Sequence, residues 1–514
     1  MSPSPPRLFA LYGRGGSLAF WTRTLVQARA EVEAAKLKTI DDLPGPTLSK
    51  TLFWLFVKGY ADKSHLLQGA QKNLYGPIWR SKFGPFDLVN VASPELIAQV
   101  IHQEGRYPVR AELPHWKEYR DLRGQAYGLH VDKGEEWYRI RSALNPKMLK
   151  LQEVSAYAPI IHQVVEDLLQ RIEFLRARSP DGISVSDVTA ELYKFGFEGI
   201  SSILFETRLG CLREDIPKDT ERFIAAVNDM LTLSEIVVIF PRWTRRILPF
   251  WKRFIQAWDD LYDTAQKLID SRLADIQSQM ERGEPTQGLY LTYLLSCDKI
   301  TRSEIYISVT ELLLGGVDTT SNTLSWALYH LARDPRAQDR LYSEVNAVCG
   351  DGRKPGMDDL QAMPYLKAVI KETLRLYPVV PGNGRFVTEN EVMVDNYWFP
   401  KKTQFHLCHY VVSRDHAQFA RADDFVPERW LRPGHKVTPG FFQHHPYSFI
   451  PFGVGVRGCV GKRVAEMEMY FALCRLMQRY EVRPGGDDQA PVQAKTRTLL
   501  IPARPINLRF LLRA

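Results

Sequence analysis

The chain has 514 residues, of which 45% are hydrophobic and 25% charged, an ordinary composition for a globular protein. Its formal net charge of +8 favours an acidic partner, nucleic acid or an anionic membrane, but no RNA- or DNA-binding motif is present. The six cysteines lie far apart and form no CxxC pair, which argues against a disulfide framework and a zinc ribbon.

The N-terminal 30 residues contain four arginines, several serines and no acidic residue; Glu31 is the first carboxylate. This composition is typical of a transit peptide. We therefore expect a mitochondrial transit peptide over residues 1–35 and the folded domain over residues 36–514. A disordered basic tail is the alternative. No apolar run of about 18 residues occurs, so no transmembrane helix is expected.

Apolar residues at helical spacing predict a mostly helical chain from about residue 46 to residue 376, with clear examples over 156–175 and 251–282. An early strand is predicted at residues 88–91. The last third is richer in proline and glycine and contains short β-like runs such as 499–501. We expect one large domain, mainly α with a small β part.

The longest predicted helix begins at a capping box formed by Thr301 and Glu304 and ends at Asp334-Pro335. Gly315 and Gly316 stand in its middle, where each costs about 1 kcal/mol relative to alanine. Such a pair indicates a kink or the close approach of a bulky group. Tight packing against another helix is the alternative.

A glycine-rich segment over residues 452–461 reads Phe-Gly-Val-Gly-Val-Arg-Gly-Cys-Val-Gly. Its glycines permit tight turns and let the backbone approach a flat ligand. A helix is predicted over 462–469, so Cys459 lies near a helix N-terminus, where the dipole and free N–H groups favour the thiolate. Arg457 can offer a bidentate contact to a carboxylate. These residues indicate a loop that holds a thiolate in place.

The spacing Phe-x-x-Gly-x-Arg-x-Cys-x-Gly resembles the haem-binding signature of the cytochrome P450 family at every fixed position. The resemblance implies the cytochrome P450 fold, a single large domain around a buried haem b. It also implies that Cys459 is the axial ligand of the haem iron and that Phe452 and Arg457 contact the haem. A thiolate on haem iron favours O–O cleavage, so monooxygenase activity is expected. A buried cysteine in a glycine-rich turn is the alternative.

Three further residues resemble the family's haem contacts. Trp137 and Arg141 resemble its Trp-x-x-x-Arg helix, which implies contact with a haem propionate. Arg385 resembles the propionate arginine of the first sheet. Arginine suits both places because it stays charged when partly buried. A solvated surface residue is the alternative for Arg385.

The segment from Gly315 to Thr320 resembles the family's oxygen-activation segment. This implies that Asp318 and Thr319 relay protons, with Thr319 ordering water and dioxygen and Asp318 connecting to solvent.

Glu372 and Arg375 resemble the family's Glu-x-x-Arg pair, and Arg429 its later arginine. The implied role of these three is a buried structural triad, since removing one partner would strand a buried charge.

Within the family, the chain resembles the vertebrate mitochondrial enzymes that hydroxylate sterols and vitamin D. Lys367 and Lys371 resemble a docking site for an acidic [2Fe–2S] ferredoxin, which implies electrons from NADPH through ferredoxin reductase. Two solvated helix lysines are the alternative. Residues 240–251 mix aromatics with arginines and resemble a membrane-contacting loop, which implies the matrix side of the inner mitochondrial membrane. Core packing is the alternative.

Residues 55–61, 107–110, 248–253 and 408–415 resemble the sterol 27-hydroxylase, whereas residues 193–200 and 495–500 resemble the 25-hydroxyvitamin D 1α-hydroxylase. We favour hydroxylation of the side chain of a sterol or secosteroid, at position 26 or 27 of a sterol; 1α-hydroxylation is the alternative. By the same resemblance, the pocket includes Val379, Val380 and Leu500.

Two other classes remain: a haem–thiolate isomerase or dehydratase, which needs no external electrons, and a haem or lipid carrier without oxygenase activity. The Asp318-Thr319 pair argues against the first.

Overall fold

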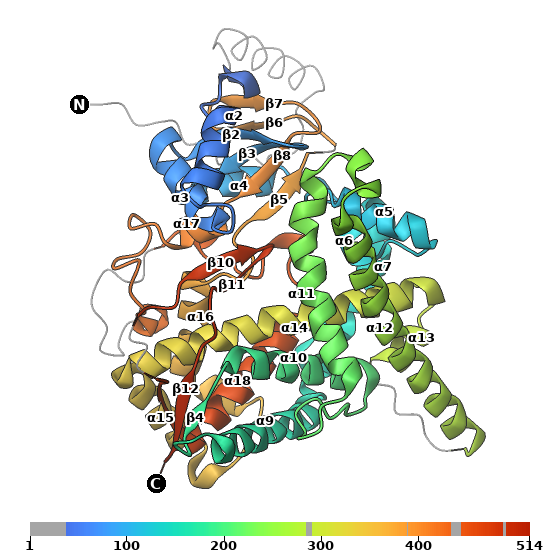
Figure 1. Cartoon of the computed structure of the whole chain (residues 1–514), viewed down its shortest axis with the longest axis vertical. Coiled ribbons are helices and arrows are strands. Elements are labelled where there is room, and N and C mark those ends of the chain that lie inside the picture. Colours follow the sequence, from blue (N-terminus) through green and yellow to red (C-terminus); the bar gives the residue numbers. More distant parts are fainter. Residues whose placement is uncertain (1–37, 284–289, 388, 433–443, 487–489, 514) are drawn as a thin grey trace, which may run out of the picture.

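The computed structural model describes residues 38–283, 290–387, 389–432, 444–486 and 490–513 (Figure 1). The transit peptide predicted over residues 1–35 lies outside these residues. Helices dominate the described chain and four small sheets accompany them, so the predicted fold class is confirmed. In the described ranges, no helix has both the length and the apolar character needed to cross a membrane.

The helices follow the predicted pattern closely. Their bounds are α2 (Leu48–Leu52), α3 (Ser64–Tyr75), α4 (Pro94–His102), α5 (Pro114–Arg123), α6 (Gly128–Val131), α7 (Gly134–Leu149), α8 (Leu151–Ser155), α9 (Ala158–Arg178), α10 (Val188–Phe205), α11 (Lys218–Ile239), α12 (Pro249–Glu281), α13 (Leu291–Leu295), α14 (Arg302–Arg333), α15 (Pro335–Val348), α16 (Pro364–Leu376), α17 (His409–Ser413) and α18 (Lys462–Arg479).

The described chain contains more strands than the sequence predicted, which indicated strands at residues 88–91 and 499–501. They are β1 (Lys38–Thr39), β2 (Ile78–Phe83), β3 (Phe86–Val91), β4 (Ser184–Val185), β5 (Asn383–Phe386), β6 (Val392–Val394), β7 (Tyr397–Phe399), β8 (Gln404–Leu407), β9 (Tyr480–Pro484), β10 (Ala494–Arg497), β11 (Leu499–Pro502) and β12 (Leu508–Leu512). The largest sheet has the order β2-β3-β8-β5, and β3 pairs in parallel with β8. The predicted early strand therefore joins a segment from the last third of the chain.

α14 is the predicted helix that crosses the domain, but with 32 residues it is not the longest, since α12 has 33. Its capping box is present: Thr301 Oγ1 accepts from Glu304 N (3.3 Å), and Glu304 Oε2 accepts from Thr301 N (2.8 Å). The helix is buried along most of its length and packs most extensively against α10. Figure 1 shows α14 through the middle of the molecule, with α9 and α10 on one side and the largest sheet on the other.

The two mid-helix glycines of α14 have different surroundings. A Cβ on Gly316 would lie 2.8 Å from Ile200 of α10, so tight helix packing accounts for this glycine. A Cβ on Gly315 would have no atom within 4 Å. Gly315 therefore borders open space, which belongs to the cavity described next.

Candidate active site

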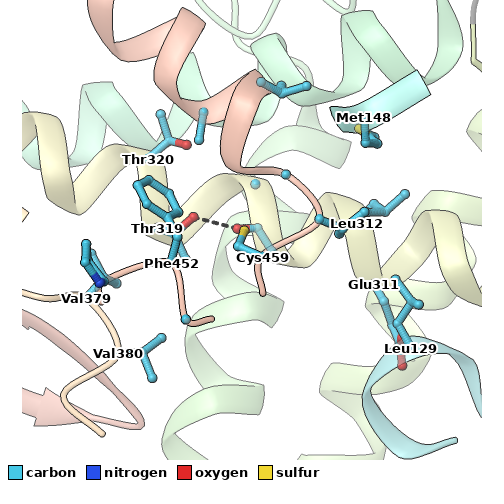
Figure 2. Close-up of a pocket in the computed structure, with 18 of the residues that line it drawn as sticks. Leu129, Met148, Glu311, Leu312, Thr319, Thr320, Val379, Val380, Phe452 and Cys459 are labelled. Carbon is cyan, nitrogen blue, oxygen red and sulfur yellow. Dashed lines mark hydrogen bonds between the residues drawn. The ribbon is translucent and has the colours of Figure 1, made fainter. Parts of the chain in front are cut away.

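A cavity lies between α14 and the loop that carries Cys459 (Figure 2). The volume of this cavity that water can enter is about 240 Å³. The α14 wall includes Gly315 and Thr319. Much of the remaining wall is apolar and comes from α6, α7, α10 and the segment before β5, with the side chains of Leu129, Met148, Ile200, Val379 and Val380. Such a cavity suits an apolar ligand.

The loop before α18 is shaped by two glycines in the left-handed region. Gly453 has φ 68° and Gly455 has φ 67°, which residues with a Cβ rarely adopt. The backbone N–H of Cys459 donates to Phe452 O at 2.7 Å and closes the loop. Cys459 therefore lies three residues before the first residue of α18, beside the cavity.

The Cys459 thiol experiences opposing influences. Burial raises its pKa, whereas the backbone N–H of Gly461 and the guanidinium groups of Arg110 and Arg141 lower it. The neighbouring groups thus stabilise a thiolate, and a metal cation bonded to the sulfur would add to their effect.

Four arginines, here called the arginine cluster, line the same end of the cavity: Arg110, Arg141, Arg385 and Arg457. Arg457 packs over the Trp137 ring, with 3.4 Å between the guanidinium carbon and the ring centroid, and its Nε donates to Pro108 O at 2.6 Å. Arg141 Nη2 donates to Gly458 O at 2.7 Å.

The arginine cluster holds more positive charge than the protein neutralises. Burial first, and then Arg110, Arg385 and Arg141, lower the pKa of Arg457 to about 9. In the described part of the chain, Glu104 is the carboxylate that forms an ion pair with a member of the cluster, through Arg385. Four buried guanidinium groups with a single paired carboxylate are stable only if a further anion binds beside them. The two propionates of haem b fit this requirement, beside a thiol that can bind iron.

All the residues predicted to contact haem therefore line one cavity: Trp137, Arg141, Arg385, Phe452, Arg457 and Cys459. Arg110 was not foreseen as a haem contact. It belongs to none of the predicted haem-contact motifs and reaches the site by tertiary contact, donating from Nη2 to Arg457 O at 2.5 Å.

Asp318 and Thr319 face different surroundings. Thr319 lines the cavity, and its Oγ1 donates to Gly315 O at 2.7 Å, the dashed line in Figure 2. Asp318 is buried away from the cavity and accepts from Arg497 Nη2 of β10 at 2.8 Å. Only Thr319 of the predicted pair therefore lines the cavity, and Arg497 is a partner of Asp318 that no local motif indicated.

An acid that was not foreseen, Glu468 of α18, also lines the cavity. Burial raises its pKa to about 8. Glu468 is therefore mostly protonated at neutral pH.

The predicted triad is assembled inside the protein. Glu372 Oε2 accepts from Arg375 Nε at 2.9 Å, and Glu372 Oε1 accepts from Arg429 Nε at 3.0 Å. Glu372 also accepts from Trp430 Nε1 at 2.9 Å. Since these side chains are almost completely buried, losing one partner would leave an uncompensated charge.

The two predicted docking lysines lie on α16, the helix that also carries Glu372. Lys371 is exposed and Lys367 is half-buried. Lys462, three residues after Cys459, is within electrostatic range of Lys371. These three lysines form what we call the basic patch.

Comparisons with known proteins agree with this geometry. The family model "Cytochrome P450" matches residues 43–510. The chain is 44% identical over 484 residues to "Sterol 26-hydroxylase, mitochondrial" of Rattus norvegicus, covering 93% of this chain and 90% of the relative. It is 41% identical to "Cytochrome P450 27C1" of Aquarana catesbeiana (95% and 90%). It is 42% identical to "25-hydroxyvitamin D-1 alpha hydroxylase, mitochondrial" of Homo sapiens (92% and 93%).

Proposed function

Because this chain belongs to the cytochrome P450 family, we propose that it hydroxylates the side chain of a sterol or secosteroid. It is a monooxygenase and its cofactor is haem b. Bound haem supplies the reductive activation of O2, after which one oxygen atom enters a C–H bond and the other leaves as water. The observation that carries the proposal is an apolar cavity bounded by Cys459, the arginine cluster and Thr319.

The chain's own residues have separate tasks in this proposal. Cys459 would bond the haem iron, and the arginine cluster would bind the propionates. Thr319 directs its hydroxyl hydrogen to Gly315 O, so its oxygen can accept a hydrogen bond from water in the cavity. Asp318 is assigned the onward proton transfer; it lies on the part of α14 that does not line the cavity, and Arg497 supplies its counter-charge.

Electrons would come from NADPH through a flavoprotein reductase and an acidic [2Fe–2S] ferredoxin. The basic patch of Lys367, Lys371 and Lys462 supports this partner, because Lys462 lies three residues after Cys459 and within electrostatic range of Lys371. Complementary charge speeds such encounters in a salt-dependent way.

The proposed compartment is the mitochondrion, on the matrix side of the inner membrane. The names of the sterol and vitamin D relatives support the compartment. Trp243 and Ile247 are 68% and 72% exposed, and the neighbouring Arg242 side chain is 77% exposed. Exposed apolar side chains beside cations suit an anionic lipid surface. Phe250 and Trp251 instead pack against the core, so core packing accounts for the end of this segment.

A second exposed apolar group lies on the short π-helix η2 (Phe53–Val57), directly after α2. Phe56 is 71% exposed and Val57 is 68% exposed, with Lys58 next to them. This group supports peripheral contact with the membrane beyond the predicted loop.

A substrate panel tests the proposed function. The holoenzyme would be mixed with NADPH, ferredoxin reductase, ferredoxin and either cholesterol or 25-hydroxyvitamin D, and the products identified by mass spectrometry. Side-chain hydroxylation is expected. Exclusive 1α-hydroxylation would favour the alternative supported by the vitamin D relatives. An iron that ferredoxin cannot reduce would contradict the proposed electron supply.

A further inference from the structure

Two polar side chains interrupt an otherwise apolar side of the cavity: Glu311 of α14 and His130 of α6. Figure 2 shows Glu311 on the opposite side of Cys459 from Val379 and Val380. Neither Glu311 nor His130 has a role in the proposed binding of haem or in proton transfer.

Glu311 has one carboxylate oxygen, Oε1, that is ion-paired with Arg120 but accepts no hydrogen bond from the described residues. Its side chain is fully buried, and Oε2 accepts from the His130 backbone N–H at 3.2 Å. Among the described residues, Oε1 has no hydrogen-bond partner; Arg120 Nη2 lies 3.6 Å away, beyond good hydrogen-bond distance. A buried acceptor without a donor is costly, so Oε1 is suited to a donor that the ligand brings.

The surroundings hold both side chains in place. The His130 Nδ1 lies 3.1 Å from Glu311 Oε2, and the His130 ring packs against Trp116 with 5.5 Å between centroids. The Arg120 guanidinium lies 4.1 Å from the Trp258 ring and supplies the counter-charge to Glu311. A site held in this way binds its ligand without first ordering its own side chains.

We propose that Glu311 and His130 bind an alcohol group of the substrate, with Glu311 Oε1 accepting the hydroxyl hydrogen and the His130 ring beside it. This inference rests on the proposed sterol or secosteroid substrate and adds the group that the enzyme recognises. Glu311 precedes Thr319 by eight residues on α14, which corresponds to about 12 Å along the helix axis. The recognised alcohol and the oxidised C–H bond therefore lie toward opposite ends of an elongated ligand.

An acceptor at this position discriminates between ligands of the same shape. An alcohol donates a hydrogen bond to Oε1, whereas a ketone or a hydrocarbon leaves Oε1 unpaired. Sites built to hydrogen-bond a hydroxyl reject the analogue that lacks it, because their own buried polar groups then lose a partner.

Isothermal titration calorimetry of the holoenzyme tests whether the site recognises an alcohol. The three probes are an alcohol, cholest-5-en-3β-ol, a ketone, cholest-4-en-3-one, and a hydrocarbon, cholest-5-ene, each delivered in cyclodextrin. We expect the wild-type chain to bind the alcohol at least about tenfold more tightly than the other two. Glu311→Gln removes the charge of the acceptor, and His130→Phe keeps the ring but removes its nitrogens. Each variant is expected to reduce the alcohol preference severalfold or more.

The ratio of the affinity for the alcohol to the affinity for the other two probes separates recognition from a structural role. A structural defect would weaken the binding of all three probes alike. Glu221→Gln, an exposed glutamate on α11, is the matched control and keeps the ratio. If Glu311→Gln does not fold, the affinity ratio of His130→Phe tests the inference instead. This variant is expected to fold because His130 is half-exposed. An unchanged ratio in the folded variants overturns the inference. A wild-type chain that binds none of the probes overturns the sterol proposal itself.

Discussion

At Cys459, burial and the surrounding positive groups act on the thiol in opposite directions. Burial disfavours the charged sulfur, while Gly461 N–H, Arg110 and Arg141 favour it. The loop backbone, closed by the bond from Cys459 N to Phe452 O, fixes where the sulfur lies. Position and charge stabilisation thus come from different neighbours, and a substitution of the sulfur alone leaves both intact.

Cys459→Ala is expected to abolish the red-shifted ferrous–carbonyl band that thiolate ligation produces. The arginine cluster and Trp137 remain, so part of the haem is expected to stay bound. The carbonyl difference spectrum and the haem content per chain measure the two effects. Cys297→Ala, a half-buried cysteine elsewhere, should keep the band. A Cys459→Ala protein with an unchanged band would refute the assignment of the ligand.

Thr319→Ala is expected to uncouple NADPH oxidation from hydroxylation and to release hydrogen peroxide. The reason is that Thr319 Oγ1 can accept a hydrogen bond in the cavity while donating to Gly315 O. Thr319→Ser retains the hydroxyl and should restore most of the coupling. Peroxide and hydroxylated product per NADPH are the quantities to measure. Full coupling in Thr319→Ala would remove this residue from proton transfer.

At the scale of elements, the two adjacent glycines of α14 face different surroundings: Gly316 packs against α10, and Gly315 borders the cavity. Gly316→Ala would place a methyl group 2.8 Å from Ile200, and overpacking of this kind costs about 1–3 kcal/mol. Gly315→Ala meets only open space and gains up to about 1 kcal/mol of helix propensity. We therefore expect Gly316→Ala to lower the melting temperature of the holoenzyme and Gly315→Ala to leave it equal or higher.

A compensating change checks the cause of that difference. Ile200→Ala should recover stability when combined with Gly316→Ala, because it removes the side chain that the new methyl group meets. Equal melting temperatures for the two glycine variants would show that α10 does not pack on α14 as closely as described.

Local pattern explains which elements and residues could be predicted from the sequence. The bounds of α14 follow from a capping box and an Asp-Pro pair, which act within a few residues. The Glu372–Arg375 contact follows from their spacing on one helix.

Tertiary contact explains what could not be predicted. β1 pairs in parallel with β7, which comes from the last third of the chain, and no local pattern specifies this pairing. Glu104 and Arg497 likewise reach Arg385 and Asp318 only when distant segments meet.

At the scale of the molecule, two surfaces are expected to contact other assemblies. For the apolar surface, the double variant Trp243→Ser, Ile247→Ser should bind vesicles of phosphatidylcholine and cardiolipin at least about tenfold more weakly, since each side chain contributes about 1.5–3 kcal/mol when buried. Co-sedimentation with vesicles measures the change. Met280→Ser, which removes another exposed apolar side chain, is the control. Equal losses in both proteins would contradict a specific membrane-binding surface.

For the basic patch, Lys371→Glu is expected to raise the KM for ferredoxin by about tenfold or more at low salt, because it opposes the acidic partner with a like charge. The kcat at saturating ferredoxin should change little, since Lys371 does not line the cavity. The effect should shrink as ionic strength rises, because salt screens exposed charges beyond about 10 Å at 0.1 M. Lys218→Glu, an exposed lysine at the start of α11, makes the same charge change elsewhere. If both reversals raised KM equally, net charge rather than docking at α16 would account for the association.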